Sequence, residues 1–396
     1  MMPSKNNKDT TSISIEITTI SYQNLEISSS NNKKNKNKDL KEISQKLQKS
    51  FQNYGIVFIS NIPKFTSLKQ SLLPQTYNLA RCTTKEYLEN ELTDVKSLYN
   101  AGWSHGKEKL NDTGSPDLSK GSFYYNPITD IPGSQKDREE YPCSYPCNIW
   151  PGIKDNDSDH HSIPESFECL CKEMGRLMHH VTVLVSRHID NYMMDNNVNV
   201  KDKYSDDLLY NSLKDTEKVK CRLLYYYPIT TNNDNGHEDK EDSWIGWHND
   251  SGFLTALAGD IYVDDETGAV LPNGHPDPDT GLYISDCNGT IHNIQIPKDC
   301  MAIQIGECTQ IITGGMVRAT PHCVKAGRDQ SIARISLACF VDTKADFRLC
   351  IPKWCRIDDV ISCPLKDKVP PLDKRWNDGI TFGEFLDNTF RKFYDW

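Results

Sequence analysis

The chain has 396 residues and a formal net charge of -10, with 45 Lys and Arg against 55 Asp and Glu. A chain of this length can bury a large core in one or two domains. The acidic balance argues against a nucleic-acid partner, which needs a basic surface. The first residues hold no apolar stretch typical of a signal peptide, and no later stretch approaches the roughly 20 apolar residues that span a bilayer. We therefore expect a cytoplasmic protein without a nucleic-acid or membrane partner; the sequence does not predict its oligomeric state.

Fourteen cysteines are scattered from Cys82 to Cys363. A chain of this length needs no disulfide staples. No grouping of these cysteines has the paired C-x2-C spacing of a structural zinc site. We expect reduced thiols that are mostly buried and behave as small apolar residues.

The N-terminal part of the chain predicts a strand–helix–strand unit. Apolar residues alternate with polar ones over 13–17, which indicates a short strand. Residues 28–39 are polar low-complexity sequence and are predicted to form an expanded surface loop. Apolar residues then recur at spacings of three and four over 40–51, as in an amphipathic helix. The apolar run at 55–59 indicates a buried strand, so the polar tract is not a domain boundary.

The next part predicts two helical stretches with loops between them. One covers about 66–93 and should be kinked or split by Pro74. Residues 100–163 are rich in Gly, Pro, Asp and Tyr, and we expect long irregular loops there. A strong amphipathic pattern predicts a helix over 164–194 with Pro164 at its start.

From about residue 218 the sequence becomes a series of short apolar runs separated by Asn-Gly turns, which is typical of an antiparallel sandwich or barrel. The candidate strands are 221–229, 252–263, 281–286, 290–296, 301–306, 310–315 and 333–341. Aromatic residues over 377–395 predict a packing helix. We therefore divide the chain into an N-terminal helical and loop region at 1–215, a β core at 216–345 and a C-terminal extension at 346–396 that packs on the core.

The triplet His-x-Asp occurs four times, at 188–190, 237–239, 248–250 and 275–277. In a helix, positions i and i+2 point about 200° apart, so the copy at 188–190 cannot share a metal. His188 is expected to be a satisfied core histidine. The copies at 237–239 and 275–277 lie among turn residues and look solvated. Only the copy at 248–250 opens an apolar strand, where i and i+2 point the same way.

Partners for this triplet lie further along the chain. His322 follows a glycine pair in a strand-like region and can supply a third ligand. Arg334 and Ser336 lie on one face of a predicted strand, where a guanidinium and a hydroxyl can bind a carboxylate. Tyr225 and Tyr227 alternate onto one face of another strand and offer two phenols for the same pocket. Two histidines and one carboxylate form the facial triad that suits non-haem Fe(II).

These segments, taken in order, resemble the Fe(II)/2-oxoglutarate-dependent dioxygenases of the isopenicillin-N-synthase-like (clavaminate-synthase-like) group. The likeness spans most of residues 12–345, and only the catalytic half is motif-specific. The N-terminal strand–helix–strand unit resembles the family's N-terminal region more weakly. The segments that carry the likeness are LLYYYPI (223–229), WHNDSGFLTAL (247–257), GLYI (281–284), 302–324 and ARIS (333–336).

The resemblance implies an α+β fold with a mainly β core, a double-stranded β-helix or distorted jelly roll, with flanking N-terminal helices and a C-terminal helix. It implies Fe(II) as cofactor, with 2-oxoglutarate and O2 as co-substrates. The implied metal ligands, which form the catalytic centre, are His248, Asp250 and His322. The implied 2-oxoglutarate residues are Arg334, Ser336, Tyr227 and Tyr225, the last of which replaces the family's asparagine.

The implied reaction couples decarboxylation of 2-oxoglutarate to hydroxylation or desaturation of a small organic molecule, whose identity the sequence does not predict. One alternative is an Fe(II) oxidase of the same fold without 2-oxoglutarate, because Arg334 and Ser336 could bind a substrate carboxylate. Another is a non-catalytic binding protein. The long interval between the histidines predicts an added hairpin and loop at 259–280. Candidates for the substrate wall, unless they only cap the structure, are Trp103, His105, Lys107, Tyr124, Tyr125 and Arg318.

Overall fold

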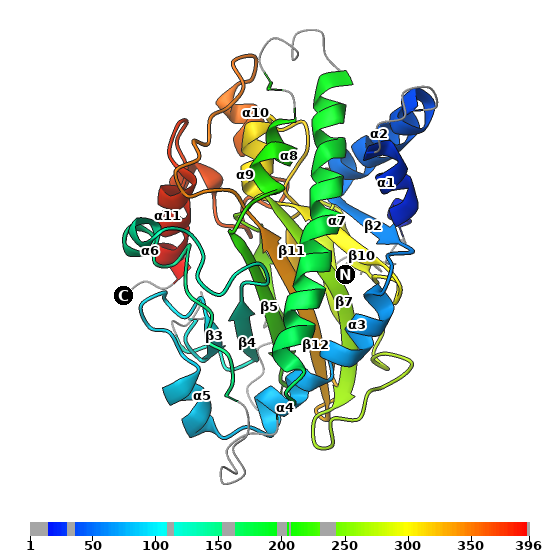
Figure 1. Cartoon of the computed structure of the whole chain (residues 1–396). Coiled ribbons are helices and arrows are strands. Elements are labelled where there is room, and N and C mark those ends of the chain that lie inside the picture. The colour runs from blue at the N-terminus through cyan, green and yellow to red at the C-terminus, as the bar shows by residue number, and fades with distance from the viewer. Residues whose placement is uncertain are drawn as a thin grey trace, which may run out of the picture.

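The computed structural model describes residues 15–29, 36–108, 115–152, 163–195, 204–205, 207–229 and 243–393. Two β-sheets form its centre, and helices cover one of them (Figure 1). The large sheet runs, in spatial order, β1 (Thr19–Ser21), β2 (Ile56–Ser60), β10 (Met301–Ile305), β7 (Leu254–Asp264), β12 (Ile332–Val341), β5 (Val219–Tyr226), β4 (Lys120–Tyr125) and β3 (Gly102–His105). The small sheet runs β6 (Ser243–His248), β11 (His322–Lys325), β8 (Gly281–Ser285) and β9 (Ile291–Ile294).

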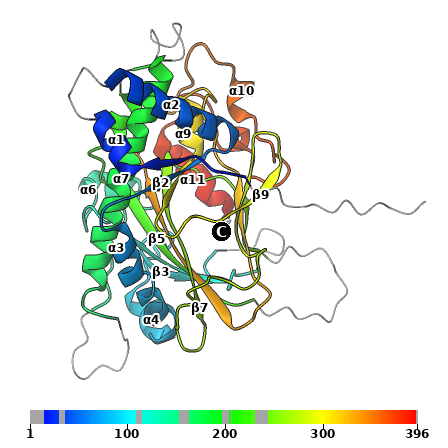
Figure 2. The ribbon, with the colours of Figure 1, turned by 90° about the vertical axis from the view of Figure 1, so that its right-hand side faces the viewer.

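The long helix α7 (Phe167–Asp195) lies along the large sheet and contacts β7 and β12 (Figure 1). Seen from the side, α1, α2, α3 and α7 lie together on one side of this sheet (Figure 2). The remaining helices are α1 (Tyr22–Ser29), α2 (Lys36–Asn53), α3 (Phe65–Leu72), α4 (Gln75–Arg81), α5 (Lys85–Glu91), α6 (Gln135–Glu140), α8 (Leu208–Leu213), α9 (Glu307–Ile312), α10 (Ile357–Ile361) and α11 (Phe382–Phe393), with a 3-10 turn at Leu372–Lys374. None of the helices described is long and apolar enough to cross a membrane.

The two faces of the large sheet have different partners, because successive side chains of a strand point to opposite faces. On β12, Ile335 and Leu337 belong to the main apolar core, whereas Arg334 and Ser336 face the other way. This alternation was predicted from the sequence. The small sheet packs over that second face through clusters that combine residues of both sheets, for example Tyr226 with Val324. A space between the two sheets is therefore available for a site.

The structure corrects four sequence-based expectations. Residues 310–315 are not a strand: α9 covers Glu307–Ile312, and all its side chains are buried, so no amphipathic pattern marked it as a helix. The loop expected at 100–163 contains β3 and β4, because β4 finds a partner in β5. Helix α2 begins inside the polar tract 28–39, of which 30–35 lie outside the described residues. The first described strand is at 19–21, later than the predicted one at 13–17, whose residues 13 and 14 lie outside the described residues.

Other expectations are confirmed. The helical stretch 66–93 is split at Pro74, which separates α3 from α4, and the predicted C-terminal helix is α11. All fourteen cysteines are free thiols, as expected. The expectation that most of them are buried is wrong, because only six are. Strands from the N-terminal region join the same sheet as the core strands. The boundaries at 215 and 345 remain predictions.

Gly175 tests how closely α7 packs on the large sheet. A Cβ at this buried position would collide with the ring of Pro127 and with Cys221 Sγ on β5. We expect Gly175→Ala to lower the free energy of unfolding by about 1–3 kcal/mol through overpacking, although alanine is favoured in a helix by about 1 kcal/mol. Urea unfolding measures the effect. Cys169→Ala, at an exposed position of the same helix, is the control, and an equal or higher stability of Gly175→Ala would contradict the packing.

Candidate metal centre and its cavity

The register between two neighbouring strands brings two histidines together. Strands β6 and β11 are antiparallel, and His248 lies directly opposite His322. Side chains at opposite positions of an antiparallel pair share one face and lie close together. The centroids of the two imidazole rings are accordingly 4.2 Å apart.

Asp250 completes the cluster from the turn that follows β6. Its Oδ1 lies 4.0 Å from His248 Nε2 and 3.9 Å from His322 Nε2. The three ligand atoms all lie within 4.8 Å of one another, and within the described ranges no other group of His, Cys, Asp or Glu side chains of this size meets that condition. Two imidazole nitrogens and one carboxylate oxygen are the donor set of a non-haem Fe(II) centre with open positions.

Backbone carbonyls orient both imidazoles. His248 Nδ1 lies 2.8 Å from the Gly246 oxygen, and His322 Nδ1 lies 2.9 Å from the Thr320 oxygen. A proton on Nδ1 leaves the lone pair of Nε2 free to bind a metal. Burial, together with the neighbouring His322, lowers the pKa of His248 to about 4. The imidazole of His248 is therefore neutral near pH 7, which is the form that binds metals.

The loop that carries Asp250 rests on the first turn of α9. The Asp250 carbonyl accepts the Glu307 N–H at 2.8 Å, and the Gly252 carbonyl accepts the Cys308 N–H at 3.0 Å. A Cβ at position 252 would collide with the carboxylate of Asp342. The close approach of this loop to its neighbours explains the glycine of the His-x-Asp-x-Gly segment.

A buried ion pair, which the sequence analysis missed, supports the same loop. Arg375 donates from Nη2 to Glu307 Oε1 at 2.6 Å and from Nη1 to Glu307 Oε2 at 2.8 Å. The Asn249 side chain turns away from the ligands and lies 3.4 Å from Glu307 Oε1. Arg375 Nη1 also lies 3.5 Å from Ser251 Oγ. The two ion-pair partners are far apart in the sequence, and no motif links them, so no signal pointed to this support.

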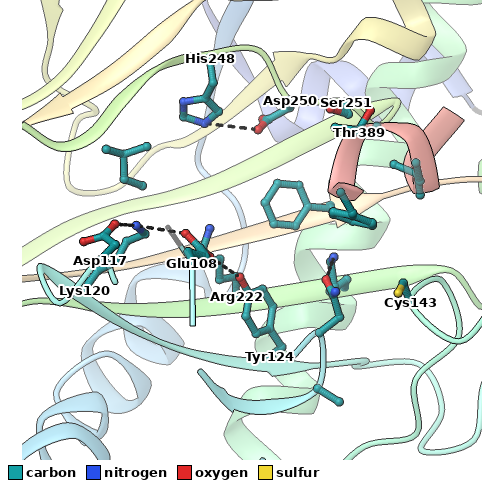
Figure 3. Close-up of a pocket in the computed structure, with 18 of the residues that line it drawn as sticks. Glu108, Asp117, Lys120, Tyr124, Cys143, Arg222, His248, Asp250, Ser251 and Thr389 are labelled. Carbon is teal, nitrogen blue, oxygen red and sulfur yellow. Dashed lines mark hydrogen bonds and ion pairs between the residues drawn. The ribbon is translucent and has the colours of Figure 1, made fainter. Parts of the chain in front are cut away.

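His248 and Asp250 line a cavity of about 1030 Å³. In Figure 3 they lie across this cavity from Glu108, Tyr124 and Arg222. Of the candidates for the substrate wall, Tyr124 lines the cavity. Tyr125 and Tyr227 are also among the lining residues, but their rings pack against the main core on the helix side of the sheet. Among the described lining residues we do not find the other four candidates, which are Trp103, His105, Lys107 and Arg318.

The tyrosine that faces Arg334 differs from the predicted one. In the register between β12 and β5, Arg334 lies opposite Tyr226, and Tyr225 lies opposite Ile335. The Arg334 guanidinium lies 4.6 Å from the centroid of the Tyr226 ring. Tyr225 belongs to the core on the helix side, and its hydroxyl donates to Asp265 at 2.6 Å. The prediction that Tyr225 faces the pocket is therefore wrong, because the face of β5 was assigned one residue out of phase.

Arg334 is buried and only partly satisfied. Its Nη2 donates to Asp260 Oδ1 at 2.6 Å, whereas its Nε and Nη1 have no acceptor among the described residues. Ser336 lies on the same strand face and is also buried. Buried donors without acceptors are costly, so the carboxylate of a small molecule would fit here. Neither side chain belongs to the described wall of the cavity that His248 lines.

The two other His-x-Asp triplets that the structure describes do not form metal sites. His188 is buried, as predicted, and Asp190 accepts the Tyr204 hydroxyl at 2.6 Å, which ties α7 to a later segment. His275 Nδ1 accepts the backbone N–H of Asp277 at 2.9 Å within a turn. The triplet at 237–239 lies outside the described residues.

No protein-family model matches the chain, and a search of curated proteins found no match. Solved structures do match. A full-length protein of Neurospora crassa, in complex with alpha-KG, has a TM-score of 0.63 and 18% identity, with 96% of each chain covered. A 2OG-Fe(II) oxygenase family protein of Caulobacter crescentus has a TM-score of 0.62 and 18% identity, covering 95% of this chain and 98% of that chain. JOX2, in complex with 2OG, Fe and JA, has a TM-score of 0.59 and 14% identity, covering 98% and 88%. The chain thus has the fold of the Fe(II)/2-oxoglutarate oxygenases.

Removal of Arg375 tests how much the protein is destabilised when the buried Glu307 carboxylate loses its partner. Arg375→Leu leaves the Glu307 carboxylate buried without its cation, and we expect the free energy of unfolding to fall by about 3–5 kcal/mol. The double variant Arg375→Leu/Glu307→Leu removes both charges and should recover most of that loss. Urea unfolding of the wild type and the two variants measures both effects. A double variant no more stable than the single variant would contradict this account.

Proposed function

We propose that this protein is a non-haem Fe(II)- and 2-oxoglutarate-dependent dioxygenase that hydroxylates or desaturates a small organic molecule. The observation that carries the proposal is the cluster of His248, Asp250 and His322, of which His248 and Asp250 lie in the wall of a large cavity. Its two nitrogens and one oxygen leave three coordination positions for other ligands. The fold supports the same function, because the Neurospora crassa protein and JOX2 share it and were solved with alpha-KG or 2OG.

The sheet arrangement supports the finer description of the fold. The small sheet, with the order β6-β11-β8-β9, packs on the face of the large sheet that carries Arg334 and Ser336, which we call the inner face. We propose that these two sheets form the double-stranded β-helix, with the metal ligands on paired strands of the small sheet and in the turn that follows β6.

The residues of the chain have separate tasks in this proposal. His248, Asp250 and His322 would hold Fe(II), which, when bound, supplies the activation of O2 coupled to decarboxylation of the oxo acid. The free donors of Arg334, with the Ser336 hydroxyl beside them, would hold the far carboxylate of 2-oxoglutarate. Asp260 fixes one edge of the guanidinium, and Tyr226 lies against its face. Tyr227, which was predicted to assist in binding 2-oxoglutarate, has no such task here, because its ring lies 5.0 Å from that of Tyr225 on the helix side and its hydroxyl donates to the Ala80 carbonyl at 3.4 Å.

One rival function has a specific observation in its favour. Asp260 already pairs with Arg334, and Arg334 is not among the described residues of the cavity wall. An Fe(II) oxidase of the same fold, which uses the electrons of its own substrate, needs no anchor for 2-oxoglutarate. The two functions differ in whether succinate is formed.

Metal binding tests the centre itself. We expect one Fe(II) per chain in an anaerobic titration of the wild type. Loss of a residue that only contacts a metal ligand lowers metal affinity by about 10–100-fold. His248→Ala removes a ligand itself, so we expect its affinity for Fe(II) to fall further than that. His275→Ala, which changes a histidine of another His-x-Asp triplet, is the matched control and should bind as the wild type does. Equal Fe(II) affinity of His248→Ala and the wild type would exclude the centre.

Use of 2-oxoglutarate tests the reaction class. With Fe(II), O2 and 2-oxoglutarate, we expect the wild type to form succinate even without a substrate, at a low rate. Arg334→Met should raise the KM for 2-oxoglutarate by about tenfold or more, since charged hydrogen bonds contribute about 1.5–3 kcal/mol. Arg356→Met changes an exposed arginine and serves as the control. Oxygen consumption without succinate would support the oxidase instead.

A further inference from the structure

Strand β5 and the residue directly before it carry three cationic side chains that point to the cavity. Lys218, Lys220 and Arg222 alternate along the chain, so their side chains share one face of the strand. All three line the cavity that His248 and Asp250 also line. Lys218 is buried, and Lys220 and Arg222 are half-buried. Basic side chains are rarely withdrawn from water without partners, so the partner of each one indicates what the cavity requires.

The two outer cations of the row have carboxylate partners. Lys218 Nζ lies 3.7 Å from Asp342 Oδ2, and Arg222 Nη2 lies 2.8 Å from Glu108 Oε1. A fourth cation, Lys120, lies 3.1 Å from Glu108 Oε2 and also pairs with Asp117. Figure 3 shows Arg222, Glu108, Lys120 and Asp117 across the cavity from His248 and Asp250.

Lys220 is the remaining cation. Apart from the metal ligand Asp250, the described wall of the cavity holds the cations Lys120, Lys218, Lys220 and Arg222 and the carboxylates Glu108, Asp117 and Asp342. These described carboxylates all have other partners, and no described carboxylate lies within ion-pair distance of Lys220. With Asp250 assigned to the metal, the described residues of the wall therefore carry four positive and three negative charges.

The surroundings of the Lys220 ammonium are aromatic. Its Nζ donates to Asn100 Oδ1 at 2.7 Å. The centroids of the Phe390, Tyr124 and Phe340 rings lie 5.4, 5.6 and 5.8 Å away. An ammonium has three N–H donors, so two of them have no described acceptor. Aromatic faces stabilise a cation but do not neutralise it.

Burial and the neighbouring Lys218 lower the pKa of Lys220 to about 8. The ammonium form still predominates at pH 7, but at an energetic cost that an anion would remove. A single surplus charge matches a monoanion. The aromatic rings around it offer apolar contact and no further donors, which suits a carboxylate attached to an apolar body.

We infer that Lys220 anchors a carboxylate of the substrate, so that the substrate is an apolar organic acid; this inference rests on the proposed function of the cavity. The aromatic wall would pack against the body of the acid, and the ion pair would fix its orientation toward the metal centre. Lys220 is then a specificity-determining residue, separate from the 2-oxoglutarate anchor at Arg334.

Pairs of ligands that differ only in charge test the inference. The probes are phenylacetate with phenylacetamide, 1-naphthylacetate with 1-naphthylacetamide, and decanoate with decanamide. Their affinities are measured by ligand-observed NMR on the full chain with Zn(II) and saturating 2-oxoglutarate, so that the acids cannot simply occupy the 2-oxoglutarate site. The proteins are the wild type, Lys220→Met and Lys220→Arg. Lys325→Met is the matched control, because Lys325 also lies over a ring, that of Tyr283, but outside the described cavity wall.

We expect the wild type to bind at least one acid tenfold or more tightly than its amide. This preference should fall to about one in Lys220→Met and persist in Lys220→Arg and Lys325→Met, with thermal melting as the check on folding. No preference in the wild type, no binding of any acid, or an unchanged preference in Lys220→Met would overturn the inference. Weaker 2-oxoglutarate binding in Lys220→Met, with the acid preference intact, would also overturn it, because Lys220 would then anchor the co-substrate.

The same experiment separates this inference from the proposed function. Failure of the wild type to bind 2-oxoglutarate with metal present would contradict the dioxygenase. The acid preference, measured again without 2-oxoglutarate, would still decide the role of Lys220. Normal 2-oxoglutarate binding without any acid preference would remove the substrate anchor and leave the dioxygenase intact.

Discussion

The pairing of β6 with β11 is the constraint on which the centre depends. It places His248 opposite His322, and β11 is held in register on its other side by β8. A shift of one residue would move His322 to the opposite face of the strand and separate the ligands. The clusters between the two sheets, such as Tyr226 with Val324, oppose such a shift because they would be broken by it.

The charges inside the molecule follow a second regularity. Nearly every buried ion on the inner face of the large sheet has a close partner, as Arg222 has in Glu108 and Lys218 has in Asp342. An ion pair holds its two side chains in place, but the electric field of one partner largely cancels that of the other. The incompletely satisfied groups are therefore the ones available to recognise acids: two guanidinium nitrogens of Arg334 have no acceptor, and Lys220 has no counter-ion, among the described residues. The proposed anchor for 2-oxoglutarate at Arg334 and the proposed anchor for the substrate at Lys220 both rest on this incomplete charge balance.

Much of the centre was predictable from the sequence, because its signals are local. The strand period singled out His248 and Asp250 among four similar triplets, although β6 ends at His248 and Asp250 lies in the following turn, not in a strand. The face shared by Arg334 and Ser336 followed from their spacing. Tyr225 was assigned to the wrong face because three consecutive tyrosines leave the phase of β5 undetermined; only the pairing of Tyr226 with Arg334 fixes it. Helix α9 was taken for a strand because its apolar residues are buried all round. Contacts between distant segments, such as that of Glu307 with Arg375, leave no periodic trace.

The ion pair of Arg375 with Glu307 also affects the order in which the metal centre can form during synthesis. The ligands His248 and Asp250 leave the ribosome well before residue 375, and His322 follows them. A nascent chain that has reached only the end of β12 thus carries all three ligands, but Glu307 has not yet met its cation and the loop at 249–252 lacks its support from Arg375. The loop that carries Asp250 thus gains this support only after the segment around Arg375 has been made and has docked, so a later part of the chain completes the surroundings of ligands made before it.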